Sequence, residues 1–212
     1  MSTPESYYVP VDAGETEFTE KRSRFLGHVR RVETEAEARA FLDEMRKKHY
    51  DARHNCWCYV LHDGGVVRYG DDGEPQGTAG QPMLNVFQRE GVENVVCVVT
   101  RYFGGVLLGA GGLTRAYAKS AKDALDAAGK ARMRLWSVVT VDCPYPMLER
   151  LKLLAAAHGG TVEGTDFGEA VSVHILLPQE NTAGFDVALT ELSAGSLAAQ
   201  RKGERFLPGA RE

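Results

Sequence analysis

The sequence predicts an α+β protein built from two domains, and three observations carry this prediction. The 212 residues suffice for two small hydrophobic cores. Apolar residues repeat with strand spacing and helix spacing in turn along the chain. After a short basic segment between Gly129 and Arg134, the pattern becomes strand, helix, strand, strand, helix, strand, which is the order of a ferredoxin-like domain. We therefore place the two domains at residues 1–131 and 132–212.

The first predicted elements are strands followed by a helix. Residues 15–32 alternate between apolar and polar positions enough to predict one or two strands. Thr34 and Glu37 have the spacing of a capping box, so a helix is expected to begin there and to run to about His49. Four apolar residues recur at helical spacing and should face the core: Ala38, Phe41, Leu42 and Met45.

The middle of the first domain is predicted to contain a hairpin and a polar loop. Two β-rich runs, 56–62 and 66–70, flank the Asp-Gly-Gly sequence at 63–65, which has the chemistry of a short hairpin turn. A glycine-rich polar loop follows at 71–80. Pro82 then suits the first turn of the next helix.

The end of the first domain combines a buried strand with a long helix. The strand is expected at 95–103 and leads into a second glycine-rich loop at 104–112. That loop opens a helix from about Leu113 to Ala128, and Gly129 should end it. In the second domain we expect strands at 135–143, 161–167, 170–177 and 196–203, and helices at 147–157 and 183–193.

Composition and charge restrict the class of protein. The net charge of −4 argues against a protein that coats nucleic acid through bulk positive charge. No apolar run approaches the roughly 18 to 20 residues of a membrane-spanning helix, and residues 1–12 lack the order of a signal peptide. A cytoplasmic protein without a membrane partner is expected. No CxxC pair occurs, so reduced thiols are expected at Cys56, Cys58, Cys97 and Cys143.

A basic segment follows the acidic start of the chain. Residues 21–31 contain no carboxylate, and their cations are Lys21, Arg22, Arg24, Arg30 and Arg31. One interpretation is an anion-binding patch on an acidic protein, because clustered cations mark such surfaces. The other is a solvated strand face whose arginines pair with acidic neighbours.

The polar loop at 71–82, DDGEPQGTAGQP, concentrates acidic residues. Its candidate functional residues are Asp71, Asp72, Glu74 and Thr78. Three carboxylates within four positions suit a hard cation, although the ligand order of a calcium loop is missing. The alternative is a turn-rich connector whose acids are hydrated.

The second long motif, RYFGGVLLGAGGLTRAY at 101–117, runs from a strand through glycines into a helix. Such a helix start exposes backbone N–H groups at the positive end of the helix dipole, which favours anion binding. The motif is neither a P-loop nor a dinucleotide-binding fingerprint, and glycine also serves close packing. Together with the basic segment, the expected nucleic-acid- or anion-binding residues are Lys21, Arg22, Arg24, Arg101, Tyr102, Gly104, Gly105, Gly109, Gly111, Gly112 and Arg115.

Strand spacing places His54, Cys56 and Cys58 on one face of a strand. A Cys56 nucleophile activated by His54 is one interpretation, because thiolate chemistry needs a nearby base. Ordinary core cysteines are the other. No second pair of ligands accompanies these residues, so we predict no metal site.

Four ordered segments resemble the YigZ/IMPACT family, specifically its bacterial YigZ-type members: KRSRF at 21–25, HNC at 54–56, and the two long motifs at 71–82 and 101–117. The resemblance covers essentially the whole chain. It implies a first domain of the ribosomal-protein-five domain-two type and a ferredoxin-like second domain. Cys58 departs from the family pattern, in which a small residue such as alanine is expected.

The resemblance also implies a role in translation, because eukaryotic relatives are described as translation regulators that act through a protein partner. We therefore expect a translation-linked, non-enzymatic protein that binds RNA or the ribosome and needs no cofactor. The alternative is an enzyme that holds a nucleotide or phosphometabolite, with magnesium, between the acidic loop 71–74 and the glycine-rich loop 104–112. A module that binds only a protein partner is a third interpretation.

Overall fold

The computed structural model describes residues 7–212, which form two compact units. The first unit comprises residues 7–133 with 208–212, and the second comprises residues 134–207. Strand β7 (Lys130–Cys143) contains residue 131, so the boundary expected from the sequence falls inside a strand. No helix within residues 7–212 combines the length and the apolar character needed to cross a bilayer.

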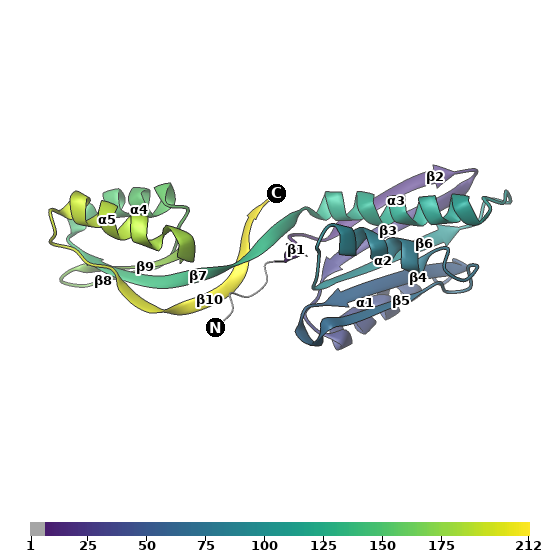
Figure 1. The fold of residues 1–212 in the computed structure, drawn as a ribbon, viewed down its shortest axis with the longest axis horizontal. Coiled ribbons are helices and arrows are strands. Elements are labelled where there is room, and N and C mark those ends of the chain that lie inside the picture. The colour runs from purple at the N-terminus through teal and green to yellow at the C-terminus, as the bar shows by residue number, and fades with distance from the viewer. Residues whose placement is uncertain (1–6) are drawn as a thin grey trace. The chain divides into compact units, whose positions relative to one another are not determined.

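The first unit is built on a five-stranded antiparallel sheet with the order β2-β3-β6-β4-β5 (Figure 1). The run predicted as one or two strands is a hairpin that turns at Lys21 and Arg22. The hairpin predicted around residues 63–65 is present, with a short 3₁₀ turn at Asp63–Gly65. The strands are β2 (Gly14–Glu20), β3 (Ser23–Arg31), β4 (His54–Leu61), β5 (Val66–Gly70) and β6 (Val95–Tyr102).

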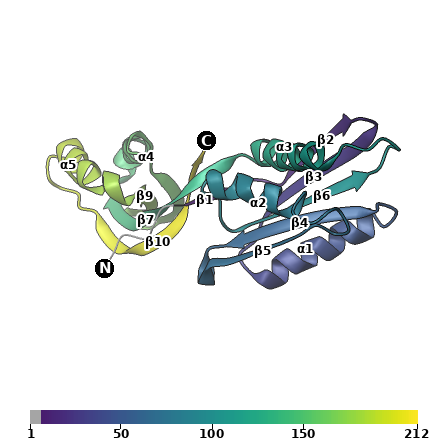
Figure 2. The ribbon, with the colours of Figure 1, turned by 45° about the vertical axis from the view of Figure 1, so that its right-hand side comes forward.

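Helices cover both faces of this sheet. Helix α1 (Glu35–Lys48) packs on one face, whereas α2 (Gly80–Arg89) and α3 (Ala110–Ala128) pack on the other (Figure 2). Strand β6 is therefore buried on both sides, and its valines alternate between the two cores with the period of a strand: Val95 and Val99 face α2 and α3, while Val96 and Val98 face α1.

Helix α1 confirms the capping prediction. The Thr34 side chain accepts a hydrogen bond from the backbone N–H of Glu37 at 3.2 Å, which satisfies one of the donors that every helix start leaves free. The four predicted core positions of this helix are all buried. Each such apolar side chain contributes on the order of 1.5–3 kcal/mol to the hydrophobic stabilisation of the fold.

Helix α3 begins earlier than predicted. It starts at Ala110 rather than near Leu113, so Gly111 and Gly112 form its first turn and do not belong to the preceding loop. Gly109 has a φ of 74° and turns the chain into the helix, and Gly129, at 67°, ends it as predicted. A first turn tolerates glycine because its N–H groups make no bond within the helix.

The second unit has the ferredoxin-like strand order that the sequence predicts. Its sheet runs β10-β7-β9-β8, and α4 and α5 pack together over it. The other elements are α4 (Leu148–Ala157), β8 (Thr161–Phe167), β9 (Val171–Pro178), α5 (Thr182–Ser193) and β10 (Gln200–Arg211). A short strand in the first unit, β1 (Tyr8–Pro10), pairs with the start of β7.

The last strand differs from the prediction. It covers Gln200–Arg211, whereas the sequence suggested 196–203. Ala194 and Gly195 have positive φ values of 49° and 81° and turn the chain after α5, so the strand begins later. It then continues through Pro208, which an edge strand accommodates because a ladder hydrogen bond is not required on its free side.

Candidate functional site

The hairpin turn and the glycine-rich loop meet at one end of the first sheet. A Cβ atom on Gly104 would lie only 2.0 Å from the backbone oxygen of Arg22, so glycine is required for this contact. Ser23 joins the same two segments, because its Oγ accepts a hydrogen bond from the backbone N–H of Gly104 at 3.2 Å. The contact places the basic hairpin turn beside the loop that leads into α3.

The hairpin turn itself is conformationally unusual. Lys21 and Arg22 have φ values of 45° and 67°, the left-handed values of a two-residue turn that normally selects Asn-Gly. Each non-glycine residue in this region costs on the order of 1 kcal/mol. Two long cationic side chains are therefore held at a site where the backbone alone would favour other residues.

Three cations at this end have no protein partner in the part of the chain that the structure describes. The side chains of Lys21, Arg22 and Arg115 form no ion pair or hydrogen bond with residues 7–212. Arg24, by contrast, is paired with Glu17 at 2.7 Å. We call Lys21, Arg22 and Arg115 the basic end.

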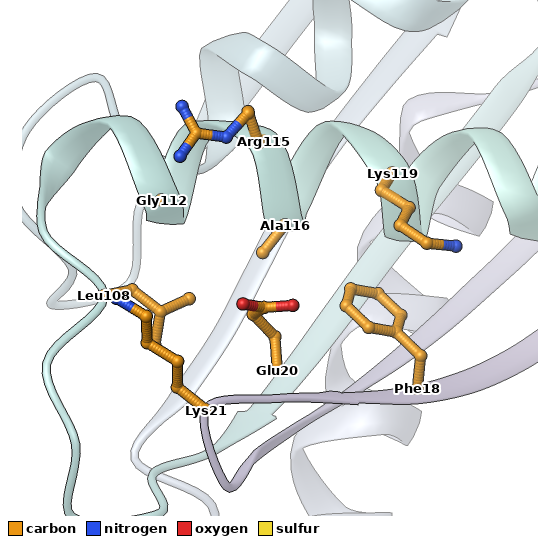
Figure 3. A pocket seen from close by; sticks show the side chains of 8 residues that line it. All are labelled: Phe18, Glu20, Lys21, Leu108, Gly112, Arg115, Ala116 and Lys119. Atoms are coloured by element: carbon orange, nitrogen blue, oxygen red, sulfur yellow. The ribbon is translucent and has the colours of Figure 1, made fainter.

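A shallow pocket of about 170 Å³ lies between the hairpin and α3 (Figure 3). Lys21 and Arg115 line it from opposite elements, with Glu20 between them. Lys119 also lines it, but its ammonium group is paired with Asp123. The lining residues are Phe18, Glu20, Lys21, Leu108, Gly112, Arg115, Ala116 and Lys119.

The start of α3 has no side-chain cap. No side chain accepts a hydrogen bond at its N-cap, Gly109, and no acidic residue lies in its first turn. A helix of this length carries roughly half a positive charge at its N-terminus. The free N–H groups of this turn therefore add to the positive potential of the basic end.

Not all the predicted anion-binding residues lie at this surface. The Arg101 side chain is buried and donates to Glu74 at 2.7 Å and to Ser23 at 3.2 Å. The Tyr102 hydroxyl donates to Asp51 at 3.0 Å. The predicted residues that do gather at the basic end are Lys21, Arg22, Gly104, Gly105, Gly109, Gly111, Gly112 and Arg115.

The three carboxylates of the acidic loop have separate protein partners. Asp71 uses both oxygens to accept from backbone N–H groups at 77, 79 and 80, so it organises the loop and the start of α2. Asp72 accepts from the N–H of Asn55 at 2.6 Å. Within residues 7–212, no cluster of three or more acidic, histidine or cysteine side chains is arranged to hold a metal ion. Thr78 likewise bonds locally, donating to the Pro75 carbonyl.

Glu74 is the centre of a buried polar cluster. It accepts hydrogen bonds from Arg101 at 2.7 Å and from the Tyr117 hydroxyl at 2.8 Å, both at Oε1. His54 Nε2 lies 4.0 Å from the same oxygen. Tyr117 and Ser23 belong to this cluster but were not predicted, although both lie inside the recognisable motifs at 101–117 and 21–25.

The geometry gives Cys56 no activating base. Its thiol donates to the Asp71 carbonyl at 2.9 Å, and His54 uses Nδ1 to donate to the Asp72 carbonyl, also at 2.9 Å. Burial raises the pKa of the Cys56 thiol far above its ordinary value, which keeps it protonated. Burial raises the pKa of Cys58 as well, and both side chains belong to the core beneath α2 and α3.

Comparison with family models assigns most of the chain to two known domains. Residues 21–125 match the Impact N-terminal domain. Residues 141–196 match a model described as a domain of unknown function, DUF1949.

Several curated proteins are similar over nearly their full length. IMPACT family member YvyE of Bacillus subtilis is 37% identical over 191 residues, which cover 90% of this chain and 88% of that protein. IMPACT family member YigZ of Escherichia coli is 34% identical, with 91% and 96% covered. Protein IMPACT of Rattus norvegicus is 31% identical over 51% of this chain and 35% of its own length.

A solved structure is similar to the whole fold. It is titled "Crystal structure of an hypothetical protein", is 34% identical, and matches with a TM-score of 0.58 over 92% of this chain and 96% of that chain.

Proposed function

Because the chain belongs to the IMPACT family, we propose that it is a translation-linked regulatory protein that binds RNA, free or in the ribosome, through the phosphate backbone. The family resemblance described above carries the expectation of a role in translation. The basic end supplies the chemistry: unpaired cations and free backbone N–H groups contact phosphates without reading base sequence.

One observation carries this proposal most directly. Lys21 and Arg22 are held in a strained turn, make no internal ion pair, and stand beside the uncapped start of α3. Strained backbone conformations persist where function requires them, and these two residues gain nothing for the fold from their charge. A phosphate group is the ligand that suits both the cations and the helix start.

Two exposed apolar side chains add a second kind of contact. Phe103 and Leu107 are 41% and 81% exposed and lie on the loop that the hairpin turn contacts. Aromatic rings beside cations are typical of proteins that bind single-stranded nucleic acid, because bases stack on them. This arrangement favours single-stranded or loop RNA over a regular duplex.

The experiment is a binding measurement with the purified full chain. Labelled single-stranded RNA, a matched RNA duplex and isolated ribosomes should each be titrated at about 50 mM and about 200 mM salt. Three phosphate contacts on a single strand predict a slope of about −2 in a plot of log affinity against log salt. The proposal fails if neither RNA nor ribosomes bind at the lower salt concentration.

A further inference from the structure

A second pocket lies on the other side of the α3 start. Its volume is about 330 Å³, and it is lined on one side by polar groups from three different motifs: His54, Glu74 and Arg101. The facing wall is apolar and includes Phe103, Leu107 and Leu113. A concave site with apolar walls and a few convergent polar groups is the usual form of a small-molecule site.

The polar side of this pocket contains an unsatisfied donor. The Nε atom of Arg101 is buried and has no hydrogen-bond partner, although the residue is only 5% exposed. Buried donors without a partner are rare in folded proteins, and each one calls for an explanation such as an absent ligand. The guanidinium carbon of Arg101 lies 5.3 Å from the centre of the Phe103 ring, which is partly exposed and forms the facing wall.

The charges around the pocket favour a ligand with a single negative charge. Glu74 balances the charge of Arg101. What remains is Arg53, which is exposed at the rim and unpaired within residues 7–212, together with the partial positive charge of the α3 start at Gly109 and Ala110. A carboxylate matches this excess better than a phosphate dianion, which would also be repelled by Glu74.

His54 and Glu74 present acceptors on the same side. Since His54 Nδ1 donates to the Asp72 carbonyl, the neutral ring carries its lone pair at Nε2, 4.0 Å from Glu74 Oε1. Glu74 receives both of its protein hydrogen bonds at Oε1. Two neighbouring acceptors favour a ligand that brings an N–H or O–H donor between them.

We infer that this pocket binds a small apolar 2-amino or 2-hydroxy acid. Its carboxylate lies toward Arg53 and the start of α3, its amine or hydroxyl donates toward His54 and Glu74, and its apolar side chain packs against Phe103, Leu107 and Leu113. The pocket is separate from the basic end, so its occupant is chemically distinct from RNA.

The test is a thermal-shift and calorimetry series on the full chain with leucine, 2-hydroxy-4-methylpentanoate, 4-methylpentanoate and leucinamide. The first two should bind saturably. The third lacks the donor and the fourth lacks the carboxylate, so each should bind at least tenfold more weakly. Inorganic phosphate and AMP should also bind at least tenfold more weakly than leucine.

Two variants locate the site. Arg53→Gln and Leu107→Asn alter exposed side chains, so they should leave the fold intact and weaken leucine binding at least tenfold. Lys47→Gln, an equally exposed charge change away from the pocket, should have no effect. Arg53→Gln should leave RNA affinity within twofold of that of the unaltered protein, which separates this inference from the proposed function. The inference is overturned if neither acid binds saturably, if phosphate or leucinamide binds as well as leucine, or if Arg53→Gln has no effect.

Discussion

Glu74 and Arg101 form an ion pair at 2.7 Å in which both side chains are almost completely buried, at 3% and 6% exposure. The carboxylate comes from the loop after β5 and the guanidinium from β6, so the pair joins the two longest motifs of the sequence. Tyr117 on α3 bonds to the same carboxylate. This cluster fixes the glycine-rich loops relative to the sheet, and the basic end stands on that support.

The first prediction concerns this ion pair. Arg101→Met should reduce the free energy of unfolding by about 3–5 kcal/mol, because it leaves the Glu74 charge buried without its partner. The double variant Arg101→Met with Glu74→Gln should lose clearly less than the sum of the two single changes. Urea unfolding followed by circular dichroism measures all four proteins, and simple additivity would contradict a coupled buried pair.

The second prediction separates stability from function at the hairpin turn. Replacing Lys21→Asn and Arg22→Gly supplies the residues that the turn geometry prefers, so stability should rise by about 1 kcal/mol or more. RNA affinity at low salt should fall at the same time, since two phosphate contacts are lost. Paired urea-unfolding and RNA-binding measurements test this opposition. Unchanged RNA affinity would show that the turn does not contact RNA.

The third prediction concerns the thiols. Cys56, Cys58, Cys97 and Cys143 are all free and buried. Burial raises the pKa of Cys56 and Cys58, so neither supplies a reactive thiolate at neutral pH. A colorimetric thiol reagent at pH 7.5 should modify the native protein slowly and should titrate all four thiols in urea. Rapid reaction of one native thiol that Cys56→Ala abolishes would restore the interpretation of a nucleophilic cysteine.

The fourth prediction concerns pH. His28 is buried beside His49, Lys48 and Glu15, and burial lowers its pKa below the ordinary value of 6.5. The unfolded chain therefore binds this proton at a higher pH than the folded chain does. The contribution is complete above about pH 6.5 and is lost as the pH falls from there through the folded-state pKa. His49, whose pKa burial also lowers, acts in the same direction.

The corresponding measurement is the free energy of unfolding between pH 5 and pH 8 for the unaltered protein and for His28→Leu. The variant should show a flatter dependence below pH 6.5, whatever its absolute stability. Parallel curves for the two proteins would mean that His28 titrates alike in the folded and unfolded chains.

Local patterns predicted much of the fold. The capping pair Thr34 and Glu37 and the apolar period of α1 are properties of neighbouring residues, so the sequence alone indicated them correctly. The start of α3 was misplaced because Gly111 and Gly112 are poor helix formers, and only tertiary packing accounts for their helical state. The last strand was misplaced because its pairing with β7 is a long-range contact.

The candidate site shows the same division between local and long-range information. The basic segment and the glycine-rich helix start were visible in the sequence, and the structure brings Lys21 and Arg115 to one pocket. The burial of Arg101 was not visible, because its partner Glu74 lies 27 residues away. The acidic loop suggested a cation site from composition, whereas Asp71 bonds to backbone groups that only the folded loop brings near it.

The most direct measurement compares the salt dependence of single-stranded RNA binding in two triple variants. One carries Lys21→Gln, Arg22→Gln and Arg115→Gln, and the matched control removes the same charge at exposed positions elsewhere, with Lys47→Gln, Arg89→Gln and Arg150→Gln. The account predicts that the first variant loses most of its affinity and that its salt slope falls by about 2, while the control keeps the slope of the unaltered protein. Equal loss in both variants would show that binding follows net charge, and no loss in the first would show that the basic end does not bind RNA.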